Sequence, residues 1–299
     1  MVAVGCTKEY FRCWSEYNEG LVERGTILSD LSWITTFHDD LERMNRGKRG
    51  RPFLYTDRMI AYLGGLASAL GMRYRSLEGH LRAILDAVGI GVPDFSTIWR
   101  RILSMDVGGC PSDGRGVVAA VDSTGIRVGV RGEWMREKWK VRKGWVKLHI
   151  LTDVRTNRIL SYVITDERTG DSGLLLALVD QAVASGHSLV KVLADGAYDT
   201  RANWKGLRER DIEYVTNIRC NASERFKGCS ARGLAVRERD AIGDETWKKM
   251  KGYSMRWKVE SAISDLKRMF GDNVRSRTMA NMVREMELKI HIFNMMKGL

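Results

Sequence analysis

The sequence predicts an α/β protein (α+β, with a mixed sheet) in which a helical N-terminal region precedes a sheet covered by helices. The first observation is a helical apolar periodicity over about residues 56–105. The second is a change after residue 111, where short apolar runs typical of strands alternate with helical segments. A strand meander followed by strand–helix–strand crossovers implies a sheet with antiparallel and parallel pairs. We therefore expect two regions, 1–110 and 111–299.

The composition indicates a globular protein with a polyanionic partner. Of 299 residues, 49 are Lys or Arg and 37 are Asp or Glu, which gives a net charge of +12. This balance favours nucleic acid through counterion release, although a basic enzyme with another substrate would show it too. Five scattered cysteines argue against a disulfide framework or a structural zinc site. Without a long apolar run or a signal-like N-terminus, we expect a soluble, intracellular protein with no membrane partner.

Three short helices with tight turns are expected in the N-terminal region. The apolar spacing and the capping residues place them at 56–70, 76–88 and 94–105. This pattern suits a helix-turn-helix-like DNA-binding unit whose third helix reads the groove. On that helix, Arg100 and Arg101 fall on or near the polar side. A helical bundle without DNA would show the same pattern, so both interpretations stay open.

A strongly basic break precedes these helices. The stretch 46–52 contains four cations, two glycines and a proline, so we expect it to be flexible. Lys48, Arg49 and Arg51 could follow a phosphate backbone beside the helical unit. A solvated linker without a partner is the competing interpretation.

Strands and helices are expected to alternate beyond a polar turn at about 111–116. Strand patterns cover 117–121, 146–152, 158–165, 189–194 and 213–218. Helical patterns cover 171–185 and 201–210. In this order, the first and fourth strands can lie side by side. The basic stretch 219–251 is expected to be an inserted subdomain or a loop region, facing either DNA or solvent.

Two aspartates stand where short apolar strands are expected to end. Asp122 follows the first strand and Asp195 the fourth, so adjacent strands would bring both carboxylates to one edge, and a later helix could add Glu260. Three close carboxylates raise one another's pKa unless a cation binds among them. Two divalent ions would activate an attacking oxygen and stabilise a leaving oxygen, and oxygen ligands favour Mg²⁺ or Mn²⁺. Individually, each aspartate could be a turn former and the glutamate a solvated side chain.

A row of polar side chains near the C-terminus is the most informative pattern. Tyr253, Arg256, Glu260 and Lys267 have the spacing Tyr-x2-Arg-x3-Glu-x6-Lys. At about 100° per helical residue, these side chains fall within an arc of roughly 60°, and an apolar stripe lies beside it. One helix would then present a carboxylate, two cations and a phenol. That set suits a metal ion held beside a phosphate backbone.

Several short segments carry a resemblance to a known family. They are 121–124 (Val-Asp-Ser-Thr), 145–149 (Trp-Val-Lys-Leu-His), 193–199 (Leu-Ala-Asp-Gly-Ala-Tyr-Asp) and 253–267, which holds the row. These segments resemble DDE transposases of prokaryotic insertion sequences, most closely the group typified by insertion sequences four and five. Segments 74–79 and 93–97 resemble the N-terminal DNA-binding region of such proteins. The similarity spans about residues 56–297, and the row is among its most specific marks.

The resemblance implies an RNase-H-like catalytic domain with transposase activity. Asp122, Asp195 and Glu260 would be the catalytic residues and would hold Mg²⁺, with Mn²⁺ as a substitute and two ions bound. The other three residues of the row would contact DNA at the transposon end. The protein would bind the terminal inverted repeats, cleave the DNA end and transfer the strand to target DNA. It would act as a homodimer in a synaptic complex, in the cytoplasm and at the nucleoid.

A second basic stretch, 127–143, interleaves cations with aromatic residues. Trp134 and Trp139 lie within it, and Trp145 follows it. Stacking on unpaired bases near a cleaved end is one interpretation, and packing against the sheet is the other.

Other functions remain compatible with these patterns. A domesticated DNA-binding protein would keep the fold without transposing. A metal-dependent nuclease on the same fold would recognise DNA structure instead of particular ends. A basic regulator that used only residues 56–105 would leave the carboxylates unexplained.

Overall fold

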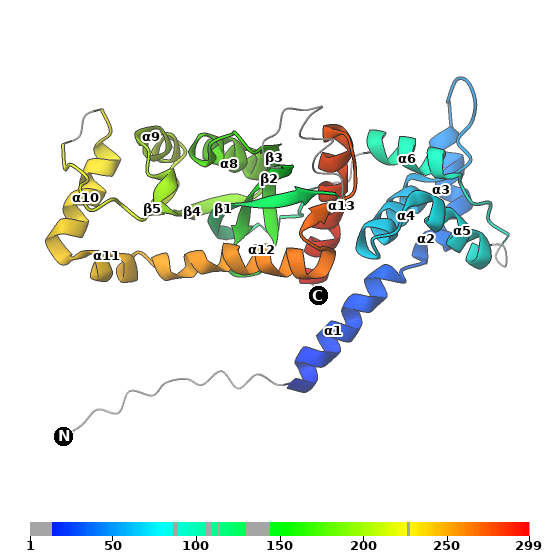
Figure 1. Cartoon of the computed structure of the whole chain (residues 1–299), viewed down its shortest axis with the longest axis horizontal. Helices are drawn as coiled ribbons and strands as arrows, with labels where there is room; N and C mark the ends of the chain where they lie inside the picture. Colours follow the sequence, from blue (N-terminus) through cyan, green and yellow to red (C-terminus); the bar gives the residue numbers. More distant parts are fainter. Residues whose placement is uncertain are drawn as a thin grey trace.

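The N-terminal part of the chain is helical, as expected. The computed structural model describes residues 14–85, 89–105, 109–112, 114–129, 144–225 and 228–298. The N-terminal helices gather at one end of the molecule, beside the sheet (Figure 1), and α4, α5 and α6 share an apolar core. Their bounds are α1 (Trp14–Leu28), α2 (Ser32–Thr35), α3 (Phe37–Asn45), α4 (Asp57–Ala69), α5 (Tyr74–Leu85) and α6 (Phe95–Ser104).

The starts of α4 and α5 show how local bonds set the helix ends. Thr56 precedes α4, and its hydroxyl accepts a hydrogen bond from the Met59 N–H at 3.2 Å, as a capping residue does. α5 starts at Tyr74, two residues before the predicted start. The reason is that the Arg73 carbonyl already accepts a helical bond from the Leu77 N–H at 2.9 Å. Ser76, which the sequence predicts as the cap of this helix, therefore lies in its first turn.

A mixed sheet forms the centre of the remaining chain. Its strands are β1 (Gly116–Val128), β2 (Trp145–Asp153), β3 (Ile159–Asp166), β4 (Ser188–Ala194), β5 (Glu213–Thr216) and β6 (Asn273–Val274). Their order is β3-β2-β1-β4-β5, and β6 pairs with β1. β1, β2 and β3 are antiparallel, whereas β4 and β5 continue the sheet in parallel with β1. This confirms the expected RNase-H-like sheet, with its first and fourth strands side by side.

Strand β1 is longer than the apolar run that predicts it. The sequence predicts Asp122 at the end of a strand, but β1 continues to Val128 and places Asp122 within it, opposite Ile150 of β2. The strand continues because pairing with β2 is made by backbone groups and does not require apolar side chains. The parallel neighbour does end at this level, since β4 stops at Ala194.

Helices cover both faces of the sheet (Figure 1). α8 (Leu175–Ala184) and α9 (Arg201–Glu209) lie on one face, and α12 (Trp257–Phe270) crosses the other against β1 and β2. Leu178 of α8 and Val259 of α12 are both fully buried, at 0% exposure. These apolar sides anchor α12 across the strand that carries the first aspartate.

The basic stretch 219–251, predicted as a subdomain or a loop region, contains two helices. α10 (Ser230–Ile242) and α11 (Asp244–Met250) lie at the end of the molecule opposite the N-terminal helices (Figure 1). Val236 and Trp247 are buried in the same core as the sheet. The stretch is therefore a packed extension of the region that contains the sheet.

A last helix, absent from the sequence-based expectations, joins the two regions. α13 (Met279–Lys297) stands between the sheet and the N-terminal helices (Figure 1). Its Phe293 is buried in the core of the sheet, and its Leu288 in the core of the N-terminal helices. The indole N–H of Trp99 on α6 also donates to Asn281 Oδ1 at 3.1 Å. The N-terminal region and the region of the sheet thus share one helix.

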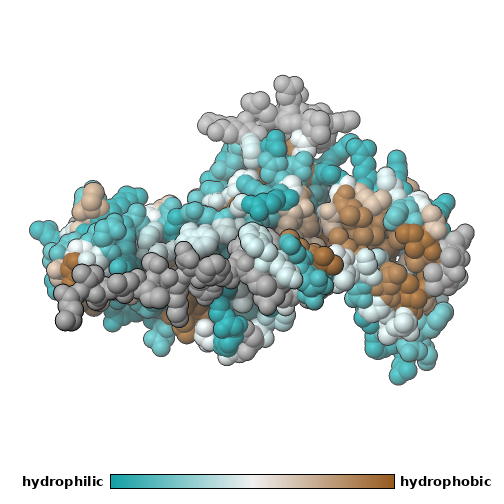
Figure 2. All heavy atoms as spheres, turned by 90° about the horizontal axis from the view of Figure 1, so that it is seen from below, coloured by the Kyte–Doolittle hydropathy of each residue, from teal (hydrophilic) through white to brown (hydrophobic). Residues whose placement is uncertain are grey.

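Apolar surface gathers at the end that carries the N-terminal helices. Figure 2 shows hydrophobic side chains clustered there and hydrophilic side chains over much of the rest of that face. A cleft of about 260 Å³ in this area is lined by Trp33, Tyr62, Leu66 and Ile292, among others, and by no predicted site residue. None of the helices in the described part of the chain combines the length and apolar character needed to span a membrane.

Candidate active site

Two carboxylates come from neighbouring strands. β1 and β4 are parallel, and Ala120 of β1 lies opposite Leu193 of β4. The pairing ends there, but Asp195 directly follows β4 in an extended conformation, and its charge raises the pKa of Asp122, so the two carboxylates lie near one another. Residues in register on parallel neighbours project to the same face of a sheet, so the register of β1 and β4 favours the same side for both carboxylates.

The turn that carries Asp195 is held from two sides. Its carboxylate accepts a hydrogen bond from the Ala197 N–H at the start of η3 (Gly196–Tyr198), and its carbonyl accepts one from the Thr216 hydroxyl at 2.6 Å. A Cβ on Gly196 would lie 3.0 Å from the carbonyl oxygen of Asn217. Glycine at this position therefore lets the turn approach the segment that follows β5.

The row predicted on one helix is divided between a 3₁₀ turn and an α-helix. Tyr253 and Arg256 delimit the turn η4, and α12, which carries Glu260 and Lys267, begins directly after it. Gly252, with a left-handed φ of 68°, turns the chain into η4. The change of helix type thus falls at the arginine of the row.

Arg256 lies between two of the carboxylates. Its Nη2 donates to Glu260 Oε1 at 2.5 Å, and its Nη1 lies 4.0 Å from Asp122 Oδ2. Burial is the main cause that raises the pKa of Asp122, and the charges of Asp195 and Glu260 add to it. The N–H of Ser123 and the guanidinium of Arg256 oppose this rise. The side chains of Asp122 and Glu260 are 26% and 53% exposed, so the cluster opens to solvent on the glutamate side.

The other two residues of the row frame this cluster. Lys267 Nζ donates to Thr124 Oγ1 at 2.6 Å, two residues beyond Asp122 on β1. Tyr253 is half-buried, and burial is the main cause that raises its pKa, with a further rise from the charge of Asp195. The structure therefore brings the whole row to the edge of the sheet that carries both aspartates.

The chemistry of these donors can be compared with the needs of a metal ion. Within the described residues, no three His, Cys, Asp or Glu side chains converge closely enough to hold one. Asp122, Asp195 and Glu260 are nevertheless close enough for their charges to interact, and carboxylate oxygens are the ligands that Mg²⁺ and Mn²⁺ prefer. A divalent cation would also stabilise the Asp122 anion, which burial disfavours. The three carboxylates fit such an ion if Glu260 releases its ion pair with Arg256 and binds the ion instead.

Among the cations predicted to follow DNA in the loop before α4, Lys48 contacts other residues of the same loop. Arg49 and Arg51 are exposed. Lys48 Nζ donates to the Arg51 carbonyl at 2.6 Å and lies 4.6 Å from the centre of the Phe53 ring. The loop is thus folded on itself, and its predicted contact with DNA stays a prediction.

The two arginines of α6 have different surroundings. Arg100 is exposed and donates to the carbonyl and hydroxyl of Ser96, one turn earlier on the same helix. Arg101 is 18% exposed, pairs with Asp57 at 2.6 Å and lies over the Phe53 ring. Arg101 therefore holds α6 against α4, and Arg100 has the position that better suits the predicted contact with DNA.

Most of the stretch 127–143, including Trp134 and Trp139, lies outside the described residues. Trp145 is half-buried at the start of β2. A Cβ on Gly125 of β1 would lie 3.1 Å from its ring. This close approach to the neighbouring strand matches the packing interpretation for Trp145.

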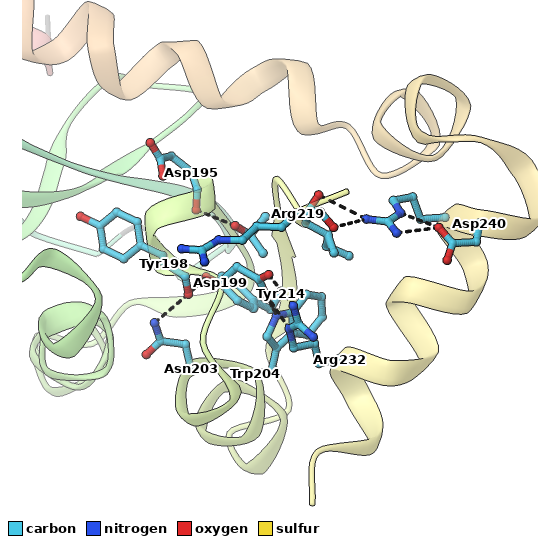
Figure 3. A network of polar contacts seen from close by, with 12 residues as sticks. Asp195, Tyr198, Asp199, Asn203, Trp204, Tyr214, Arg219, Arg232 and Asp240 are labelled. Carbon is cyan, nitrogen blue, oxygen red and sulfur yellow. Dashed lines mark hydrogen bonds and ion pairs between the residues drawn. The ribbon is translucent and has the colours of Figure 1, made fainter. Parts of the chain in front are cut away.

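A buried network beside Asp195 has no counterpart among the sequence-based expectations (Figure 3). The Asp199 carboxylate accepts hydrogen bonds from Arg232 and from the indole of Trp204. Asp199 lies in a segment that resembles the family, but its partner is 33 residues away in a stretch with no predicted elements. One signal was available, because Arg232 and Arg239 are two helical turns apart and would share a face of a helix.

Comparison with solved structures finds transposases and an integrase at low similarity. The piggyBac transposase synaptic complex with hairpin DNA gives a TM-score of 0.42 and 11% identity over 93% of this chain and 74% of that chain. The Drosophila P element transposase strand transfer complex gives a TM-score of 0.31 and 17% identity over 65% of this chain and 43% of that chain. The catalytic core domain of BIV integrase gives a TM-score of 0.25 and 10% identity over 51% of this chain and 84% of that chain. At these scores, no residue role is transferred from them.

Comparison with protein families gives a clear assignment. The family described as Transposase DDE domain matches residues 113–295, a stretch that contains the sheet, the three carboxylates and the whole row. A second family model with the same description matches residues 22–131, from the N-terminal helices into β1. The first match alone covers more than half of the chain. This protein belongs to the DDE transposase family.

Proposed function

We propose that the protein is a transposase that binds the terminal inverted repeats of its insertion sequence and catalyses metal-dependent DNA end cleavage and strand transfer. The observation that carries this proposal is the place where Asp122 on β1 lies beside Asp195, which directly follows the parallel neighbour β4, and where the helix of Glu260 crosses β1. Arg256 lies among these carboxylates, and a guanidinium in that position can also bind a phosphodiester. Membership of the family supports the same class of reaction.

The three carboxylates would hold Mg²⁺, with Mn²⁺ as a substitute. Two such ions, when bound, supply an activated attacking oxygen and stabilise the leaving oxygen of the phosphoryl transfer. The chain fixes Asp122 within a paired strand and Asp195 in a hydrogen-bonded turn. Glu260 pairs with Arg256, so its release requires another partner for the guanidinium. A DNA phosphate is such a partner.

Contacts with DNA would come from both regions. Arg256, Lys267 and Tyr253 lie beside the carboxylates and would meet the transposon end, and Arg100 on α6 would contact DNA from the N-terminal helices. The net charge of +12 favours such a partner. A homodimer would join two ends in the synaptic complex. The site of action would be the nucleoid in the cytoplasm.

The test incubates the full chain with Mg²⁺ and a plasmid that carries the DNA flanking the gene. Wild type is compared with Glu260→Gln, with a chelator and with Glu245→Gln. Glu245 is a matched control because it is also exposed in the first turn of a helix, α11. We expect end cleavage that needs the metal, is unchanged in Glu245→Gln and falls by more than about a hundredfold in Glu260→Gln, since even outer-shell substitutions weaken metal sites 10–100-fold.

Other outcomes would contradict the proposal in distinct ways. Binding of the ends without cleavage, in Mg²⁺ and in Mn²⁺, would identify a DNA-binding protein that keeps the fold alone. Cleavage that ignores the ends and gives no strand-transfer product would identify a nuclease that recognises DNA structure.

A further inference from the structure

A buried ion pair lies directly behind the turn that carries Asp195 (Figure 3). The Asp199 carboxylate is 0% exposed and accepts hydrogen bonds from Arg232 at 2.8 and 2.7 Å and from Trp204 at 2.9 Å. Arg232 is 17% exposed. A buried charge is unfavourable unless it is paired and hydrogen-bonded, as Asp199 is. Apolar residues of similar volume could fill this place without the cost of removing two charges from water. Stability alone therefore does not explain why an ion pair is buried here.

The turn between Asp195 and Asp199 is short and closed. The Tyr198 N–H donates to the Asp195 carbonyl at 3.1 Å, and the Asp199 N–H donates to the Gly196 carbonyl at 3.3 Å. The Tyr198 carbonyl accepts a bond from the Tyr214 hydroxyl at 2.9 Å. A shift of Asp199 would therefore move Asp195 too, since one 3₁₀ turn joins them.

Helix α10 reaches this edge of the sheet at two points. Arg232 and Arg239 project from one face of the helix, about two turns apart. Arg239 Nη1 donates to the carbonyls of Ile218 and Arg219, at 3.3 and 2.8 Å, just after β5. α10 is thus fastened behind the carboxyl ends of both β4 and β5.

We propose that Arg232 is a positioning residue that acts through Asp199 to hold Asp195 where a metal ion binds. The inference rests on the proposed function, because it takes Asp195 as a metal ligand. It makes α10 part of the construction of the catalytic site and not an appendage beside it. The Asp199 carboxylate bonds to Arg232 and Trp204, so the pair acts on Asp195 through the turn that joins them. Substitution of groups that orient a metal ligand weakens metal affinity about 10–100-fold in other proteins.

A second ion pair in the chain provides a matched control. Arg210, which directly follows α9, donates through the same two atoms, Nε and Nη2, to both oxygens of Asp180 on α8, at 2.6 and 2.7 Å. These side chains are 32% and 55% exposed. The pair joins the C-terminal end of α9 to α8 on one face of the sheet (Figure 1), and neither residue belongs to the turn of Asp195.

The experiment measures Mn²⁺ binding to the full chain without DNA, by electron paramagnetic resonance, and thermal melting of the same samples. Arg232→Gln and Asp199→Asn are expected to raise the Kd for Mn²⁺ about 10–100-fold. Arg232→Lys should raise it less, because an ammonium keeps the charge but loses the bidentate geometry. Arg210→Gln and Asp180→Asn should stay within about twofold of wild type, as expected for an exposed pair.

The outcome against the inference is equally definite. If Arg232→Gln and Asp199→Asn melt at lower temperature but bind Mn²⁺ as wild type does, the pair only stabilises the fold. If Arg232→Gln does not fold, Arg232→Lys decides together with Asp199→Asn, and an unchanged Kd in both overturns the inference. Wild type that binds no Mn²⁺ and cleaves no DNA would overturn the proposed function itself, which the wild-type samples alone reveal.

Discussion

The contact between α12 and β1 at Lys267 offers a quantitative test of how the row is held. Lys267 Nζ donates to Thr124 Oγ1 at 2.6 Å in a partly buried setting. A hydrogen bond that involves a charged group contributes about 1.5–3 kcal/mol. Water can replace part of this bond at a half-exposed lysine, so we expect a contribution of about 1–2 kcal/mol.

A double-mutant cycle isolates this term. Thr124→Val removes the acceptor and nearly keeps the shape, and Lys267→Met removes the charge and keeps the length. Free energies of unfolding from urea denaturation should give a coupling energy of about 1–2 kcal/mol between the two positions. Thr124→Val alone should also reduce end cleavage, because the ammonium beside the carboxylates loses its fixed place.

The same cycle can refute the reasoning. Free energies that add within about 0.3–0.5 kcal/mol would show that the bond contributes nothing measurable. Thr165→Val combined with Lys267→Met serves as the control, because the Thr165 hydroxyl contacts His149 and not the lysine. That pair should be additive, and coupling there would mean that the cycle reports a general loosening of the sheet.

Three further predictions concern other parts of the site. Gly196→Ala places a Cβ 3.0 Å from the Asn217 carbonyl oxygen, so we expect the free energy of unfolding in urea to fall by about 1–3 kcal/mol. The rate of end cleavage should fall as well, because the turn carries Asp195. Burial raises the pKa of Asp199, but its hydrogen bonds outweigh burial and leave it below the ordinary 3.8. The stabilisation by the Asp199 anion is therefore present above that pH and lost as the pH falls through the folded pKa. The difference in melting temperature between wild type and Asp199→Asn should therefore disappear in acid, and a difference that stays constant with pH would contradict this. Arg101→Gln should lower the melting temperature by about 2–4 °C. Arg100→Gln should leave it unchanged and reduce the salt dependence of DNA binding by about one logarithmic unit of slope, whereas equal effects of both on binding would refute the distinction.

The sheet and its two aspartates could be predicted because their signals are local. Each strand is a short apolar run, and the rules for crossovers leave few ways to order such runs. The length of β1 could not be predicted in the same way. Ser123, Thr124 and Gly125 interrupt the apolar run, and only Ile126 and Val128, which are buried and alternate with Arg127, continue the strand pattern. The polar interruption hides a strand that the backbone pairing with β2 keeps continuous.

Contacts between distant segments account for most of what could not be predicted. Arg232 meets Asp199 across 33 residues, and Asn294 of α13 bonds to both backbone groups of Ile159 across 135 residues. Each partner has an ordinary local context, since an arginine early in a basic helix is usually solvated. Only the packed structure shows which of the many Lys and Arg side chains form buried contacts.

The three carboxylates differ in how firmly they are held, and this difference has a consequence for the order of events. Asp122 lies in a paired strand and Asp195 in a bonded turn, whereas Glu260 is 53% exposed and pairs with Arg256. A DNA phosphate competes with Glu260 for that guanidinium, so substrate binding should free the third ligand. Mn²⁺ affinity should therefore rise when end DNA is added to wild type and rise less in Arg256→Gln, where no guanidinium has to be displaced. Equal gains in both proteins would show that Arg256 does not link DNA binding to metal binding.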